Sequence, residues 1–217
     1  MTRARRLGAV AGFTLIEILV VLTIIAAIIG IAVPIFTAAR DTSNLTICKK
    51  NLSSLGQAMT LYHQRFKGYP STRSGVQFLL APLRTKVVDY DEETIEKTVR
   101  NMYVCPGDDV ASGAIGGNVW EAYRDLDNIQ PECLSYAGRN SKEFPLRQKN
   151  AGKEVIAADA GGHDGRVFIH RSKVNILYLD GSVQDIDILE LPDGDESKFE
   201  VGPNSPLERL RMLNKDT

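Results

Sequence analysis

The feature that most constrains this chain is an apolar run near its N-terminus, GFTLIEILVVLTIIAAIIGIAVPIF, from Gly12 to Phe36. Between Ile18 and Phe36 the run contains no Asp, Glu, Lys or Arg. An α-helix needs about 20 apolar residues to cross the roughly 30 Å hydrocarbon layer of a membrane. The run therefore predicts a transmembrane helix half over residues 13–36, in preference to a buried helix of a soluble domain.

The residues before the run predict its orientation. Arg3, Arg5 and Arg6 precede it, and basic residues favour the cytoplasmic side of a membrane. We therefore expect a leader over residues 1–12 on the cytoplasmic side and the rest of the chain in the periplasm of a bacterial cell. A cleaved secretory signal is the alternative. Its apolar core is usually about 7 to 15 residues long and ends at a small-residue boundary, whereas this run is longer and continues through Pro34 without such a boundary.

Composition excludes several classes of protein. The leader holds three of the 26 basic residues and none of the 27 acidic ones, so the remainder is mildly acidic and does not favour a nucleic-acid partner. The three cysteines are too few for a disulfide scaffold and include no CxxC pair. In an oxidising periplasm Cys105 and Cys133 are a possible disulfide.

A single carboxylate, Glu17, interrupts the apolar run. A charged side chain at the centre of a membrane helix costs about 2.5 to 3.5 kcal/mol on insertion scales and is tolerated when it meets an opposite charge. Cleavage between Gly12 and Phe13 would place a new amino group one helical turn from Glu17. If that amine belonged to a neighbouring copy, pairing with it would drive assembly.

The same residues resemble a known family. Gly12 followed by FTLIE, then an apolar helix with Pro34 about halfway along, resembles the class III leader of type IV pilins and of the pseudopilins of type II secretion. The resemblance implies cleavage after Gly12 by a prepilin peptidase, N-methylation of Phe13, and use of Glu17 to align subunits in a fibre.

The helical pattern continues beyond the membrane span. Apolar residues recur at spacings of three and four, at Leu45, Cys48, Leu52, Leu55, Met59, Tyr62 and Phe66. This stripe predicts an amphipathic continuation of the helix over residues 37–68, packed on a sheet, with Cys48 as a small core residue and a coiled-coil seam as the alternative. We expect Pro34 to kink the spanning half, because proline removes a backbone hydrogen bond.

Residues 69–190 are expected to form a globular head, and the fold class is α+β with a pilin-like C-terminal antiparallel sheet. The segment DEETIEKTVRNMY predicts a short amphipathic helix, and the Gly-, Asp- and Asn-rich residues 103–136 predict a loop region with short strands. Four later segments have the pattern of strands: Val155–Asp159, Arg166–Ile169, Val174–Asp180 and Ser182–Leu189.

Asp180-Gly181 predicts a two-residue hairpin that places Tyr178 opposite Val183 and Leu177 opposite Gln184. The strands would form an antiparallel meander with two apolar faces, one on the long helix and the other under loops. The acidic tail, residues 191–217, is expected on the surface.

His170 precedes Asp180-Gly181 with nine residues between. With CPGDD at Cys105, LSYAGRN, VIAAD and Asn175, this signature resembles pilin-like proteins of planctomycetes and related bacteria. Ser182 departs from the pattern, because many relatives have a His there, and this weakens a metal site that would need that imidazole.

Two groups of residues contain metal-ligand types. Asp159, His163, Asp164, His170 and Asp180 include zinc ligand types, but the favoured interpretation is that Asp180 shapes the turn and His170 caps a strand end or bonds across the hairpin. Asp193, Asp195 and Glu196 are weak calcium candidates by similarity to major pseudopilins, without a complete EF-hand pattern. We expect no cofactor, and no catalytic motif appears.

The leading hypothesis is a structural pilin-like subunit of the bacterial inner membrane, with one span and a periplasmic head, that polymerises with itself or with other pilin-like subunits. Its partners would be a prepilin peptidase, an inner-membrane assembly platform and membrane lipid, with no nucleic acid. The alternative is a membrane-tethered periplasmic metal-binding or hydrolytic module that does not polymerise.

Overall fold

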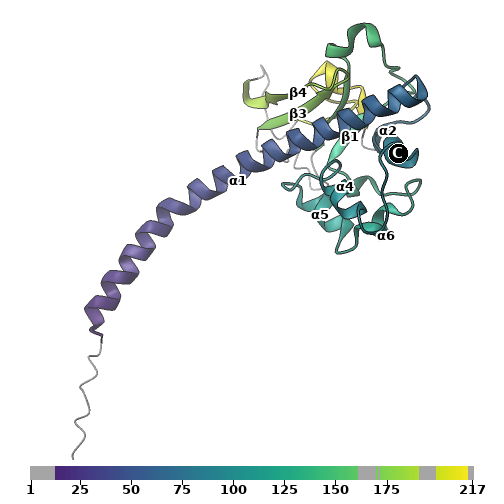
Figure 1. Ribbon diagram of the computed structural model, residues 1–217. Helices are drawn as coiled ribbons and strands as arrows, with labels where there is room; N and C mark the ends of the chain where they lie inside the picture. The colour runs from purple at the N-terminus through teal and green to yellow at the C-terminus, as the bar shows by residue number, and fades with distance from the viewer. Residues whose placement is uncertain (1–12, 161–169, 171, 191–198, 215–217) are drawn as a thin grey trace, which may run out of the picture. The chain divides into compact units, whose positions relative to one another are not determined.

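The computed structural model describes residues 13–160, 170, 172–190 and 199–214. The chain forms two compact units, Met1–Arg40 and Asp41–Thr217. The long helix α1, Leu15–Phe66, begins in the first unit and ends in the second (Figure 1). The predicted continuous N-terminal helix is therefore confirmed.

The first unit, where it is described, is the apolar part of α1. Its large side chains are exposed, from Leu15 to Phe36, and the helix is long and apolar enough to cross a membrane. The helix continues through Pro34, and the hydroxyl of Thr37 donates to the Pro34 carbonyl oxygen at 2.9 Å. The expected kink at Pro34 stays a prediction.

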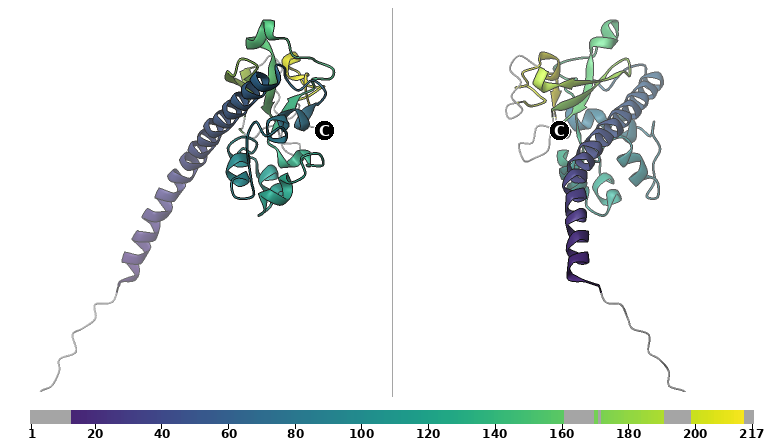
Figure 2. Two further views of the ribbon diagram at one scale, coloured as in Figure 1. Left: turned by 45° about the vertical axis from the view of Figure 1, so that its right-hand side comes forward. Right: turned by 90° about the vertical axis from the view of Figure 1, so that its left-hand side faces the viewer.

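The second unit contains a five-stranded antiparallel sheet in its described residues, in the order β4-β3-β2-β1-β5. Figure 2 shows this unit from two further sides. The strands are β1 (Tyr136–Arg139), β2 (Val155–Asp159), β3 (Lys173–Tyr178), β4 (Val183–Asp187) and β5 (Leu213–Asn214). Strands β2, β3 and β4 form the predicted meander. The α+β fold class is confirmed, and the predicted strand Arg166–Ile169 lies outside the described residues.

Short helices and turns make up much of the rest of the second unit. They are α2 (Gly75–Leu79), α3 (Ala81–Arg84), α4 (Ile95–Arg100), α5 (Asp109–Ile115) and α6 (Val119–Tyr123), with 3₁₀ turns at Pro131–Cys133, Gln148–Lys153, Ile188–Glu190 and Glu208–Leu210. Helix α4 confirms the predicted amphipathic helix.

The expectation of short strands across residues 103–136 is wrong, because this region forms α5 and α6. Two side-chain caps explain the difference. The Asp108 carboxylate accepts from the backbone N–H groups of Val110 and Ala111, and the Asn118 side chain accepts from that of Glu121. Asp and Asn at such positions start helices as readily as they form loops.

The two faces of the sheet bury two separate apolar clusters. Leu177 and Leu179 belong to the cluster that includes the α1 stripe, Cys48, Leu52, Leu55 and Met59. Val174, Ile176 and Tyr178 belong to a second cluster, with Phe199, Leu210 and Leu213 from the C-terminal segment. The prediction that one face packs on the helix is confirmed. Phe66 departs from the predicted stripe, since 48% of it is exposed.

The predicted hairpin register is wrong by one residue. Leu177 pairs with Val183, and the Tyr178 backbone N–H donates to the Ser182 carbonyl oxygen at 2.9 Å. The loop therefore contains three residues, 179–181, and Gly181 takes a left-handed φ of 85°. A shift of one residue reverses the faces of a strand. Val183 consequently packs with the helix-side cluster.

The C-terminal segment was expected on the surface, and this is wrong for residues 199–214. Phe199, Leu210 and Leu213 are buried, and Leu213 pairs with Arg139 as β5 extends the sheet. This segment covers the apolar face that the long helix leaves open.

Candidate functional site

The start of α1 carries a reciprocal cap. The backbone N–H and the hydroxyl of Thr14 both donate to Glu17 Oε2, at 2.8 Å and 2.7 Å, and the Glu17 N–H donates to Thr14 Oγ1 at 3.3 Å. This is a capping box, in which Thr and Glu three residues apart satisfy N–H groups that lack partners at a helix start. The sequence signal for this cap is the T-x-x-E spacing of Thr14 and Glu17.

The cap uses one oxygen of Glu17 and leaves its charge in place. Phe13, the first described residue, is 85% exposed, and Gly12 lies outside the described residues. Neither the cleavage nor the pairing of Glu17 with an amine is tested by these contacts, so both stay predictions.

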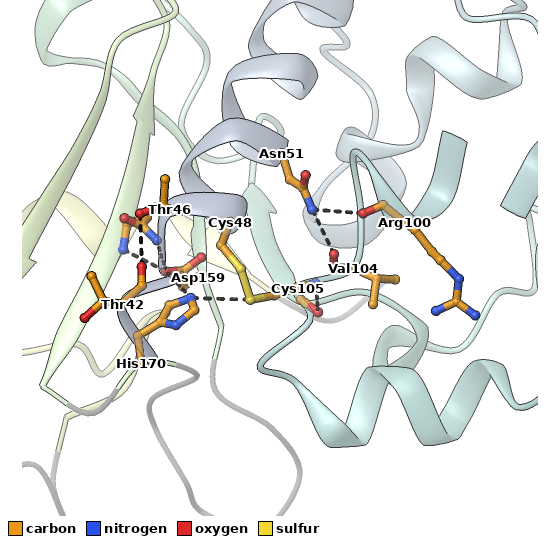
Figure 3. Close-up of a disulfide and its surroundings, with 11 residues drawn as sticks. Thr42, Thr46, Cys48, Asn51, Arg100, Val104, Cys105, Asp159 and His170 are labelled. Carbon is orange, nitrogen blue, oxygen red and sulfur yellow. Dashed lines mark hydrogen bonds and ion pairs between the residues drawn. A yellow bond between two sulfur atoms is a disulfide. The ribbon is translucent and has the colours of Figure 1, made fainter. Parts of the chain in front are cut away.

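In the second unit, a disulfide joins Cys48 of α1 to Cys105, which lies between α4 and α5 (Figure 3). The two residues are 57 positions apart in sequence, and their Cα atoms are 5.3 Å apart. The possible Cys105–Cys133 disulfide is therefore wrong, and Cys133 is a buried free thiol. The reason is that Cys48, on the buried stripe, faces the segment that carries Cys105.

Hydrogen bonds hold the same segment on the helix. The Asn51 amide donates to the carbonyl oxygens of Arg100 and Val104, each at 2.9 Å (Figure 3). The Cys105 N–H donates to Ser135 Oγ at 2.8 Å, which links the disulfide to the residue before β1. The disulfide and the hydrogen bonds of Asn51 together attach the segment from Arg100 to Cys105 to α1.

His170 lies against this disulfide. Its side chain is 3% exposed, and its Nε2 is 3.3 Å from Cys105 Sγ and 3.9 Å from Asp159 Oδ2 (Figure 3). Asp159 Oδ2 also accepts from the backbone N–H and the side-chain amide of Asn175, both at 2.8 Å. The structure therefore brings Asp159 and His170 together at the end of β2 and the start of β3.

Burial dominates the electrostatics of this pair. It raises the pKa of Asp159 to about 7 and lowers the pKa of His170 to about 4, since a dry environment disfavours both charged forms. The imidazole is thus neutral near pH 7. Asp159 Oδ1, His170 Nδ1 and Asn175 Oδ1 are buried without a hydrogen-bond partner within the described part of the chain.

The other part of the signature, Asp180-Gly181, lies at the opposite end of β3. Strand geometry separates His170 from the turn by roughly 20 Å, at about 3.3 Å per residue. Asp180 Oδ1 accepts from the Ser182 N–H at 2.9 Å and from its hydroxyl at 2.6 Å. The prediction that Asp180 shapes the turn is confirmed, and Ser182 takes part in that turn.

The other candidate ligands cannot be placed. His163, Asp164, Asp193, Asp195 and Glu196 lie outside the described residues. The weak calcium hypothesis at the last three therefore remains a sequence prediction. The contact between His170 and the disulfide had no signal in the sequence, because no spacing rule links a cysteine in a loop to a histidine before a strand.

Comparison with known proteins finds one informative relative. The chain is 33% identical over 70 residues to type II secretion system core protein G of Pseudomonas aeruginosa. The alignment covers 32% of this chain and 49% of that protein, so it spans about half the relative's length. No family model matches the chain. No solved structure matches it either. The similarity, together with the apolar N-terminal helix and the sheet, supports a pilin-like protein related to type II secretion.

Proposed function

We propose that the chain is a structural subunit that polymerises through the apolar part of α1 into a type II secretion pseudopilus or a type IV pilus-like fibre. The observation that carries the proposal is Glu17, an acid near the start of an apolar helix whose large side chains are exposed. The similarity to a type II secretion core protein supports it.

Before assembly the subunit would be a single-pass protein of the bacterial inner membrane, with a cytoplasmic leader and a periplasmic head. A prepilin peptidase would cleave after Gly12 and Phe13 would be N-methylated. An inner-membrane platform would then add the subunit to others of its kind. In this proposal the chain belongs to the planctomycete-type subgroup, and the His170 and Asp180-Gly181 signature supports that assignment. The role is mechanical and includes no catalysis.

The capping box makes a sharp test possible. Glu17→Gln keeps an oxygen that accepts from the Thr14 N–H and hydroxyl, but removes the charge. We expect this variant to insert and to be cleaved normally, yet to form few or no fibres, because no charge remains to pair with a neighbour's Phe13 amine. Fibres would be counted by electron microscopy of sheared surface fractions and of cells overproducing the subunit.

The matched control is Thr14→Ala, which removes the hydroxyl of the cap and keeps the Glu17 charge. It should assemble. Mass spectrometry of both variants should find a mature chain that begins at methylated Phe13. Normal fibres from Glu17→Gln would refute the charge-pairing argument, and a chain that keeps its leader in cells with an active peptidase would refute the proposed processing.

The membrane-tethered module that does not polymerise is the second candidate. The observation that favours it is the buried group of Cys48, Cys105 and His170, whose ligand atoms lie within 4.8 Å of one another. It predicts a single-pass protein that yields no fibres even in wild-type form. The fibre assay therefore separates the two candidates.

A further inference from the structure

We propose that reduction of the Cys48–Cys105 disulfide creates a zinc site, in which both thiolates and His170 Nε2 bind the ion and Asp159 is the fourth ligand. The disulfide-bonded form would bind no zinc at this place. The inference concerns only the second unit and does not depend on whether the chain polymerises.

The positions of the donor atoms carry the argument. Cys48 Sγ, Cys105 Sγ and His170 Nε2 all lie within 4.8 Å of one another. Tetrahedral zinc with Zn–S of about 2.3 Å and Zn–N of about 2.0 Å separates a sulfur from a nitrogen by about 3.5 Å. The observed separation of Cys105 Sγ and His170 Nε2 is 3.3 Å.

A fourth donor is already near. Asp159 Oδ2 is 3.9 Å from His170 Nε2, whereas tetrahedral zinc would hold this oxygen and nitrogen about 3.3 Å apart. The two sulfur atoms must separate to about 3.8 Å once their bond is broken. Small side-chain movements therefore suffice for His170 and the two sulfurs, whose cysteine Cα atoms are 5.3 Å apart. Asp159 is not among the donors within 4.8 Å of one another, so its carboxylate must also move toward the sulfurs to complete the site.

The surroundings suit a metal ion better than they suit the isolated side chains. His170 and Asp159 are each 3% exposed at the side chain, and Asp159 Oδ1 has no hydrogen-bond partner within the described residues. Such buried polar atoms are costly without a partner. The Asn175 amide, which donates to Asp159 at 2.8 Å, would orient the carboxylate from outside the coordination sphere.

The chemistry balances with a phosphine as the reductant. The phosphine and one water convert the disulfide to two thiols: the phosphorus loses two electrons and gains the water's oxygen as phosphine oxide, and the water's two protons go to the sulfurs. Zinc then replaces the two thiol protons, which are released to the buffer. A phosphine is preferable to a dithiol, because a dithiol would itself bind zinc.

The experiment uses the full chain in detergent micelles, after reduction with a phosphine and removal of the reductant without oxygen. Cobalt(II) serves as the spectroscopic probe and zinc as its competitor. We expect one cobalt per chain, with the sulfur-to-cobalt charge-transfer bands and d–d bands of a tetrahedral thiolate site, and loss of these bands when one equivalent of zinc is added. The unreduced protein should show neither set of bands.

Variants identify the ligands. His170→Ala and Asp159→Asn should each weaken cobalt binding by at least about 10-fold. Loss of a residue that only orients a ligand already weakens metal binding by about 10- to 100-fold, and loss of a ligand should weaken it at least as much. Cys133→Ser removes the third thiol, which is free and buried, and should bind cobalt as the wild type does. Each variant is first shown to have the wild-type melting transition in its unreduced form, so that loss of binding is not loss of fold.

Three results would overturn the proposal. They are a reduced wild-type protein without thiolate–cobalt bands, equal binding by the disulfide-bonded protein, and unchanged binding by His170→Ala. None of these results affects the fibre assay, so failure of this inference is distinguishable from failure of the proposed function.

Discussion

The Cys48–Cys105 disulfide should contribute strongly to the stability of the second unit. Replacing both residues with alanine removes a cross-link between positions 57 residues apart. In the chain-entropy model a loop of this length restricts the unfolded state by about 4 kcal/mol at 25 °C. Domains of ordinary stability unfold at a cost of about 5 to 15 kcal/mol, so the double variant should lose a large fraction of its stability.

The assay is urea unfolding of the full chain in detergent, followed by the fluorescence of Trp120, the single tryptophan, which packs against the helix-side cluster. With a urea dependence of about 2 kcal/mol per molar, a loss of 4 kcal/mol lowers the midpoint by about 2 M. The detergent-embedded apolar part of α1 contributes no tryptophan signal, so the transition reports the head.

Two controls accompany the double variant. Wild-type protein reduced with a phosphine in the presence of a metal chelator should show the same lowered midpoint, and Cys133→Ala should keep its disulfide and lose much less. A midpoint within about 0.5 M of the wild type, for both the double variant and the reduced protein, would refute the reasoning. That shift corresponds to about 1 kcal/mol, well below the typical contribution of a disulfide.

Two further predictions concern packing and charge in the same unit. Gly138→Ala should destabilise the unit by about 3 kcal/mol in the same urea assay, because a Cβ there would lie 2.2 Å from the backbone oxygen of Gly75. The control is Gly113→Ala on α5, where a Cβ would meet open space. This variant should be neutral or slightly stabilising. The hydrogen bond from Lys49 lowers the pKa of Asp185, so its stabilisation is present above the unfolded pKa near 3.8 and is lost as pH falls through the lower folded pKa. Asp185→Asn should therefore cost up to about 1 kcal/mol at pH 7 and much less at an acidic pH below the lowered folded pKa, and 1 M salt should reduce the difference at pH 7. Equal stability losses at both pH values would contradict this assignment.

The parts of the fold that the sequence predicted depend on local periodicity. Spacings of three and four identified the buried stripe of α1, and short runs rich in Val and Ile identified β2, β3 and β4. The cysteine pairing depends instead on which loop lies over the stripe. That information is non-local, and three cysteines allow more than one pairing, so Cys105 was assigned the wrong partner.

The hairpin error has a different cause. Asp180-Gly181 is compatible with a two-residue loop and with a three-residue loop that ends in a left-handed glycine. The faces of β4 did not decide between them, because Val183 and Ile186 are both apolar and lie on opposite faces. The ion pair between Lys49 and Asp185 agrees with the observed register, since Asp185 shares the helix-side face with Val183. The need of Lys49 for a charge partner is thus the sequence feature that favours this register.

The capping box stabilises the acid near the start of α1. A cap contributes about 1 kcal/mol, and a negative charge in the first turn of a helix gains about 0.3 to 1 kcal/mol from the dipole. Together they offset part of the cost of about 2.5 to 3.5 kcal/mol that a charge meets at the centre of a membrane. A neutral glutamine would cap the helix without meeting that cost, so the cap explains the oxygen at Glu17 and not its charge. In the proposed fibre, the amine at Phe13 of a neighbouring subunit would supply the cation that this charge pairs with.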